Sequence, residues 1–160
     1  MDNQKTKRRL ASYRSLRLEV DTQLDRLARL RNDEQLPAMR ESSGAKSTGG
    51  NGDRMERAIL RRMEYEGKVL PQIKAAQREM AAIEAAIDRI EDPLERECLR
   101  LRYIDGDGYR LKPWGDVAIM IYGDDDDKSL HSVFRLHGRA LQHINAHCAE
   151  NVAVNGSDWQ

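Results

Sequence analysis

One stretch near the C-terminal end of the chain collects side chains that can hydrogen-bond to nucleic acid. Its polar residues are Lys128, Ser129, His131, Ser132, Arg135 and Arg139. Hydroxyl and imidazole groups can bond to base edges, while lysine and arginine can bind both phosphates and guanine. We therefore take these six residues as candidates for contact with double-stranded DNA. The alternative interpretation is a charged helix face that water solvates.

The element that would position these side chains is a helix. Between the polar residues, apolar or small residues recur at steps of three and four, which is typical of a helix that buries one face. They are Leu130, Val133, Leu136, His137, Ala140, Leu141 and Ile144. We expect His137 to be a hydrogen-bonded histidine of the core.

A shorter apolar segment, Trp114–Ile121, precedes this helix, and Gly123 lies between the two. Two helices joined by a glycine-containing turn are typical of a helix-turn-helix, whose second helix can enter a DNA groove. The pattern therefore predicts a helix-turn-helix, with a plain helical hairpin as the alternative. We expect Trp114 to anchor the core rather than to stack on a base.

Four consecutive acidic residues, Asp124 to Asp127, lead into the second helix. Carboxylates at a helix N-terminus stabilise the helix by ~0.3–1 kcal/mol each. The same charges repel phosphates. Two explanations stay open: the acidic turn lies clear of the DNA backbone, or it faces a basic protein such as a polymerase subunit.

The N-terminal half of the chain predicts two long amphipathic helices. Apolar residues recur at helical spacing from about Lys5 to Arg31, and again from Arg54 to Ile90. In the second helix they form a narrow heptad seam, Val69, Ile73, Ala76, Met80, Ile83, Ile87 and Ile90. Such a seam requires a partner helix, from the same chain or from a second copy. Pro71 should kink or split this helix, because proline lacks a backbone donor.

Residues 32–53 separate these helices and are rich in glycine and serine, which predicts a flexible linker. A third helix should begin at Asp92-Pro93, because aspartate can cap a helix and proline fits its first turn. Glu95 lies where a capping box needs an acid. This helix should end before Asp105, since Gly106 and Gly108 follow closely.

Charge is distributed unevenly along a chain whose net charge is zero. Residues 1–91 hold 19 basic and 15 acidic residues, a balance of +4, whereas residues 92–160 hold 8 and 12, a balance of −4. The candidate DNA-binding segment therefore lies in the acidic part, which weakens nonspecific binding to phosphates.

Several classes of protein are not expected. The basic N-terminus has no apolar run behind it, and no segment has the ~20 apolar residues of a membrane helix, so we expect a cytoplasmic protein without membrane contact. Cys98 and Cys148 show no paired spacing. His143 and His147 lie four residues apart, as in some zinc sites, but without a second pair an ordinary surface is favoured. No catalytic motif occurs, so we expect neither an enzyme nor a cofactor or metal.

The C-terminal third resembles region 4 of sigma-70-type factors. The resemblance is carried by Leu99-Arg100-Leu101-Arg102-Tyr103, by Trp114–Ile121 and by Val133–Leu141. With the long helices before it, the segment RLHGRAL also resembles phage-encoded ArpU/RinA-like regulators. The resemblance implies a helical arm followed by a DNA-binding helix-turn-helix. The acidic turn departs from this pattern.

We therefore predict an all-α protein: a helical hairpin or coiled-coil arm over residues 1–91, a helix-turn-helix domain over 92–148, and a disordered tail over 149–160. The expected function is sequence-specific DNA binding in transcription control, in a phage-encoded protein acting in the bacterial cytoplasm. Expected partners are double-stranded DNA, host RNA polymerase and further copies of the chain, paired through the arm. The alternative is an oligomeric interaction protein that binds RNA polymerase or resembles a terminase small subunit.

Overall fold

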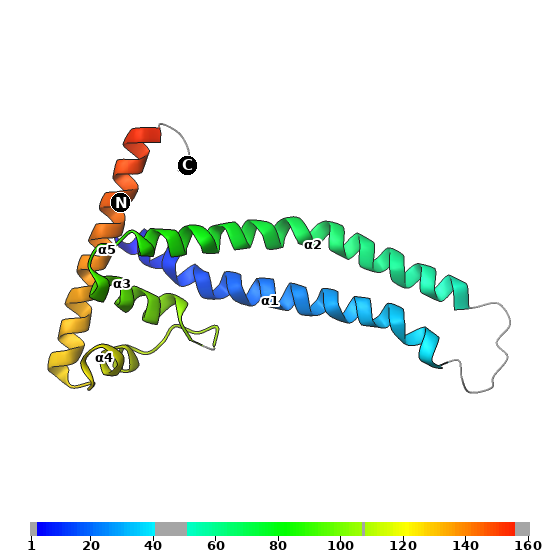
Figure 1. Cartoon of the computed structure of the whole chain (residues 1–160), viewed down its shortest axis with the longest axis horizontal. Helices are drawn as coiled ribbons and strands as arrows, with labels where there is room; N and C mark the ends of the chain where they lie inside the picture. The colour runs from blue at the N-terminus through cyan, green and yellow to red at the C-terminus, as the bar shows by residue number, and fades with distance from the viewer. Residues whose placement is uncertain (1–2, 41–50, 107, 156–160) are drawn as a thin grey trace. The chain divides into compact units, whose positions relative to one another are not determined.

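The computed structural model describes residues 3–40, 51–106 and 108–155, which form helices and turns without any strand. The predicted all-α class is confirmed. The elements are α1 (Asn3–Arg40), α2 (Asn51–Asp88), α3 (Pro93–Leu99), the π-helical turn η1 (Arg100–Ile104), α4 (Trp114–Tyr122) and α5 (Asp127–Asn155) (Figure 1). None of the described helices combines the length and apolar composition that crossing a bilayer requires.

The chain divides into two compact units. Unit 1 consists of Met1–Arg17 and Arg78–Gln160, and unit 2 of Leu18–Gln77. The start of α1 and the end of α2 thus group with α3, α4 and α5, whereas the sequence predicted a limit after residue 91. The reason is packing, because Leu10 and Ile87 share one core with residues of η1 and α5.

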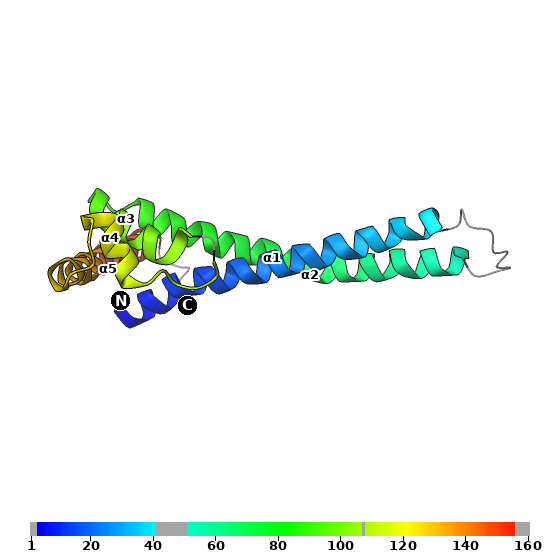
Figure 2. The ribbon, with the colours of Figure 1, turned by 90° about the horizontal axis from the view of Figure 1, so that it is seen from below.

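Unit 2 contains the remaining parts of α1 and α2, which run side by side in opposite directions (Figures 1 and 2). Their shared interior is formed by Val20, Leu27, Val69, Ile73 and Ala76, all buried. At the edge, Arg31 pairs with Glu66 at 2.9 Å. The guanidinium of Arg26 also lies 5.0 Å from the ring centre of Tyr65. This arrangement is compatible with the predicted hairpin arm.

The heptad seam of α2 is covered within the chain. Its residues Val69, Ile73, Ala76, Ile83, Ile87 and Ile90 are buried in a single copy. Because these side chains already have neighbours in the same molecule, a second copy would have to use another surface. Pairing of copies through the arm stays a prediction.

Pro71 does not split α2, which continues through it from Asn51 to Asp88. A proline ring inside a helix crowds the carbonyl of the residue four positions earlier. Here that residue is Gly67, whose lack of a side chain leaves the backbone freer to adjust.

Two predicted irregular segments are partly helical. Of the linker predicted over 32–53, residues 32–40 belong to α1 and 51–53 to α2, while 41–50 lie outside the described residues. Good helix formers such as Glu34 and Gln35 favour this extension. Of the tail predicted as disordered, residues 149–155 continue α5, and 156–160 lie outside the described residues.

Unit 1 has two hydrophobic clusters, which together hold residues 133–144 of α5. In the first, Ala140, Leu141 and Ile144 of α5 pack with residues from the start of α1, the end of α2 and the segment Leu99–Ile104. In the second, Val133 and Leu136 pack with residues of α3, η1 and α4. The opposite face of this segment, with Arg135, Arg139 and Gln142, is exposed.

Candidate nucleic-acid interface

Helices α4 and α5 are joined by a turn that depends on glycine. Gly123 ends α4 with φ +91°, a left-handed conformation that side chains disfavour. Its amide donates to the carbonyl of Ile119 at 2.8 Å, closing the last turn of α4. On the inner side, Val117 and Ala118 pack with Val133 and Leu136. The two helices are thus held together as a pair, with α5 second in the chain.

The acidic turn caps the first turn of α5. A side-chain oxygen of Asp126 accepts the amide of Ser129 at 2.7 Å. An oxygen of Asp124 accepts the Ser129 hydroxyl at 2.6 Å and the Asp126 amide at 3.3 Å. The hydrogen bonds from Ser129 lower the pKa of the Asp126 carboxyl. Ser129, predicted to contact DNA, therefore uses its hydroxyl inside the turn.

Two more of the predicted residues bond to their own helix. The hydroxyl of Ser132 donates to the carbonyl of Lys128 at 2.9 Å. His131 places its Nδ1 3.2 Å from the carbonyl of Asp127. Both side chains still lie on the outer side of α5, His131 exposed and Ser132 half-buried. Ser132 would have to release this bond before donating to a ligand, whereas Nε2 of His131 is not used by its local contact.

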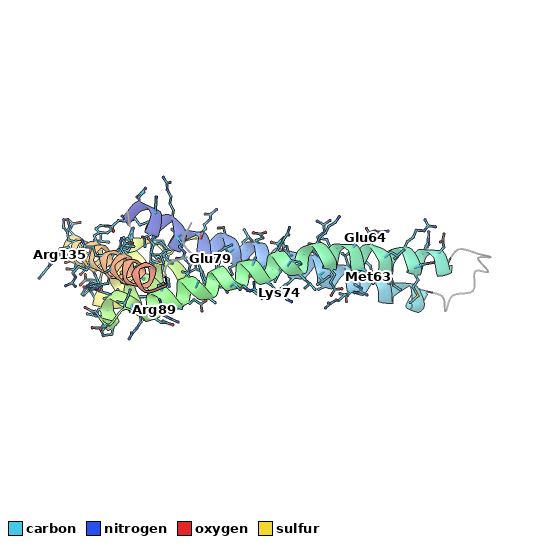
Figure 3. The ribbon with its side chains drawn as sticks, turned by 90° about the horizontal axis from the view of Figure 1, so that it is seen from above. Met63, Glu64, Lys74, Glu79, Arg89 and Arg135 are labelled. Atoms are coloured by element: carbon cyan, nitrogen blue, oxygen red, sulfur yellow. The ribbon has the colours of Figure 1, made fainter. Side chains whose placement is uncertain are left out.

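A polar hollow of about 560 Å³ lies along the exposed side of α5. It is lined by Tyr122, Ser132, Arg135, Gly138, Arg139 and Gln142. Of the six predicted contact residues, the hollow brings together Ser132, Arg135 and Arg139 and leaves out Lys128, Ser129 and His131. Figure 3 shows Arg135 projecting away from the ribbon of α5.

Tyr122, Gly138 and Gln142 were not predicted from the sequence. Gln142 lies three positions after Arg139, so extending the polar pattern of α5 by one turn would have found it. Tyr122 belongs to α4 and has no periodic relation to α5. Only the tertiary packing of the two helices brings it to the hollow.

A buried carboxylate supports one side of this surface. Glu95 of α3 is 1% exposed. Its Oε2 lies 2.5 Å from Nδ1 of His143, and its Oε1 lies 3.4 Å from Nε of Arg139. The predicted capping function is carried by Asp92, whose side chain accepts the amides of Leu94 and Glu95. Glu95 joins α3 to α5 and restrains Arg139 at the edge of the hollow.

Beneath α5, aromatic side chains surround His137. The Tyr103 hydroxyl lies 3.0 Å from His137 Nε2, and the Trp114 ring centre lies 4.8 Å from the imidazole. Burial, with Lys7 and Arg102 nearby, lowers the pKa of His137 to about 4. The predicted core histidine is confirmed. Trp114 packs against the second cluster, as expected of a core anchor.

Arg14 is a further residue that the sequence did not single out. Its side chain is buried, with 3% exposure. The guanidinium donates to the carbonyls of Asp105 at 2.5 Å, Gly106 at 3.1 Å and Gly108 at 2.7 Å. Burial lowers the pKa of its guanidinium. Arg14 lies four residues after Leu10, on the apolar side of α1. A charged residue at this position could have been recognised from the sequence as one that needs buried hydrogen-bond partners.

The described part of the chain contains no group of three or more histidine, cysteine or acidic side chains placed to hold a metal ion. Cys98 is fully buried, and burial raises the pKa of its thiol to about 12. The side chains of His147 and Cys148, considered above with His143, lie outside the described residues.

Comparison of the chain with protein-family models, with curated proteins and with solved structures found no match. A functional interpretation therefore depends on the geometry of unit 1 and on the sequence motifs.

Proposed function

We propose that this protein is a sequence-specific DNA-binding regulator of transcription, with α5 as its reading helix. The observation that carries the proposal is the exposed side of α5, where Arg135, Arg139 and Gln142 line one hollow on the second helix of a glycine-turned pair. A charged helix face without function would not need this arrangement of planar hydrogen-bonding groups along one surface.

The residues suit the major groove of B-DNA, which is wide enough for an α-helix. Arginine can donate two hydrogen bonds to guanine, and glutamine can make two with adenine. In this mechanism α4 braces the DNA backbone, and α5 presents Arg135, Arg139 and Gln142 to base edges. Ser132 and Tyr122 supply hydroxyl groups for phosphates at the sides of the groove.

The wider biological setting is proposed from the sequence resemblance. The chain would be a phage-encoded regulator of the ArpU/RinA type that acts in the bacterial cytoplasm with host RNA polymerase. Two copies would read two half-sites. Because the α2 seam is buried within one chain, such pairing would use exposed parts of the arm.

One observation favours a second candidate, an interaction protein that binds another protein through α4. Ile119, Met120 and Tyr122 of α4 are 48%, 60% and 42% exposed. They adjoin the acidic turn that follows α4. Apolar side chains beside acidic groups suit a partner surface with apolar and basic residues, such as a polymerase subunit.

DNA binding can be tested without knowing the operator. Duplexes with a random centre are enriched on the full-length protein, and the enriched duplex is compared with the starting pool by fluorescence anisotropy. Arg135→Ala should weaken binding to the enriched duplex by about 5- to 150-fold, the equivalent of ~1–3 kcal/mol for a base contact. Weak binding that does not distinguish the enriched duplex from the pool would reject the regulator proposal.

Arg89→Ala is the matched control, because Arg89 is an exposed arginine in the turn directly after α2, outside α4 and α5 (Figure 3). It removes the same charge, so an effect of net charge alone would weaken DNA binding by both variants. A loss confined to Arg135→Ala supports the proposed reading surface.

A further inference from the structure

Gly138 is a glycine in the interior of α5 for which the molecule itself shows no need. Glycine destabilises a helix interior relative to alanine, so it requires a compensating reason. A Cβ atom built at Gly138 meets nothing within 4 Å apart from its chain neighbours and the nearby backbone of its own helix. Among the described glycines, only Gly106 and Gly123 have positive φ, so the backbone at Gly138 is one that any residue can adopt.

The other open glycine inside a helix, Gly67, has a local explanation. Its Cβ would also meet nothing within 4 Å. However, it lies four residues before Pro71, where the proline ring crowds the backbone. Nothing comparable follows Gly138, since residues 139–146 of α5 include no proline.

The position of Gly138 on α5 points away from the core. Steps of four, three and four connect His131, Arg135, Gly138 and Gln142, which therefore form one line along the helix. The buried residues Val133, Leu136 and Ala140 occupy the opposite side. Gly138 thus lies in the polar hollow, with Arg135 one turn before it and Gln142 one turn after it.

We infer that Gly138 is the point at which α5 approaches double-stranded DNA most closely. The inference rests on the proposed function. Without a side chain, the helix backbone can come nearer to the floor of the major groove by the width of a methyl group. Arg135, Arg139 and Gln142 then reach base edges around this point, and any side chain at 138 would hold the helix away from them.

This placement also accounts for the acidic turn. Gly138 lies eleven positions after Asp127, about 16 Å along a helix that rises 1.5 Å per residue. At physiological salt, charges are screened over about 8 Å. The carboxylates that cap α5 therefore repel DNA centred on Gly138 only weakly. Contact centred on the first turn, at Lys128 and Ser129, would lie directly beside them.

The test compares Gly138→Ala with the wild-type protein on the enriched duplex described above. We expect the variant to melt about 2–4 °C higher, because alanine favours the helix. Its affinity for the enriched duplex should nevertheless fall at least about tenfold, and Gly138→Leu should bind still more weakly. Gly67→Ala adds the same methyl group in unit 2 and should bind DNA as the wild type does.

The outcomes are distinct. Equal binding by Gly138→Ala and wild type overturns the close approach while leaving the proposed function intact. A lowered melting temperature in Gly138→Ala also overturns it, because the glycine would then serve the fold. If the wild-type protein itself fails to distinguish the enriched duplex, the proposed function fails and the inference fails with it.

Discussion

Among single residues, His137 has the most informative environment, because it is a titratable group closed inside unit 1. Its ring lies on the buried side of α5 against Tyr103 and Trp114, and its exposure is 5%. A neutral imidazole can accept the Tyr103 hydroxyl at Nε2, whereas an imidazolium would have to donate to that oxygen instead and would carry an unpaired buried charge. The fold therefore depends on the neutral form.

The stability of the protein should decrease below neutral pH because of His137. Burial holds its pKa at about 4 when folded, and unfolding returns it to the ordinary value of 6.5. Between these values the unfolded chain binds more protons, so the contribution is complete above pH 6.5 and is lost as the pH falls toward 4. Urea denaturation should show a loss of about 2 kcal/mol from pH 7 to pH 5.

His137→Gln should remove most of this pH dependence, since glutamine does not titrate. His131→Gln changes an exposed histidine of the same helix and should leave the dependence as in the wild type. An unchanged pH profile in His137→Gln would show that other groups cause the acid sensitivity.

At the scale of elements, the acidic turn has two opposing effects: it stabilises the start of α5, and its negative charge repels phosphates. Asp124 and Asp126 hold the start of α5 through Ser129. Asp125 and Asp127 add charge at the same end, and their side chains carry none of the cap bonds described above. The turn can therefore be neutralised in part without removing the cap.

Replacing Asp125 and Asp127 together by asparagine should raise affinity for random-sequence duplex at low salt. Near 0.01 M salt, screening extends over about 30 Å, so the two carboxylates repel any DNA bound along α5. We expect a gain of about three- to tenfold there and no gain near 0.15 M, measured by anisotropy at both salt concentrations. A gain of the same size at both would place the DNA beside the turn and not at the centre of α5.

The helices could be predicted from the sequence more completely than the contacts between them. The periodicity of apolar residues was sufficient for the all-α class and for His137 in the core, because it depends only on local spacing. Tyr122 and the contacts of Glu95 were not predictable, because they arise where α4 and α3 meet α5. Glu95 satisfied a local rule for helix capping, yet its carboxylate bonds to His143, 48 positions later in the chain.

At the scale of the whole molecule, the α2 seam is buried within one chain, so substitutions in the seam should affect folding and not the assembly of copies. Ile73 is 4% exposed in a single copy. Ile73→Ala should therefore lower the free energy of unfolding by about 2–4 kcal/mol through the cavity it leaves. The mass in solution should not change, because the side chain contacts its own molecule.

Thermal unfolding and light scattering on the same samples test this prediction. Lys74→Ala changes the exposed neighbour of Ile73 and should alter neither the melting temperature nor the mass (Figure 3). A smaller mass for Ile73→Ala than for the wild type would show that the seam joins copies.

The three carbonyl bonds of Arg14 have a consequence for how the chain folds during synthesis. Arg14 bonds to carbonyls 91 to 94 positions later in the sequence, and Leu10 and Tyr13 share a core with α5. When the ribosome has completed only α1 and α2, these N-terminal groups still lack most of their partners. Unit 1 can close only after α5 has emerged, so the exposed side of α5, which we propose as the DNA-binding surface, forms last.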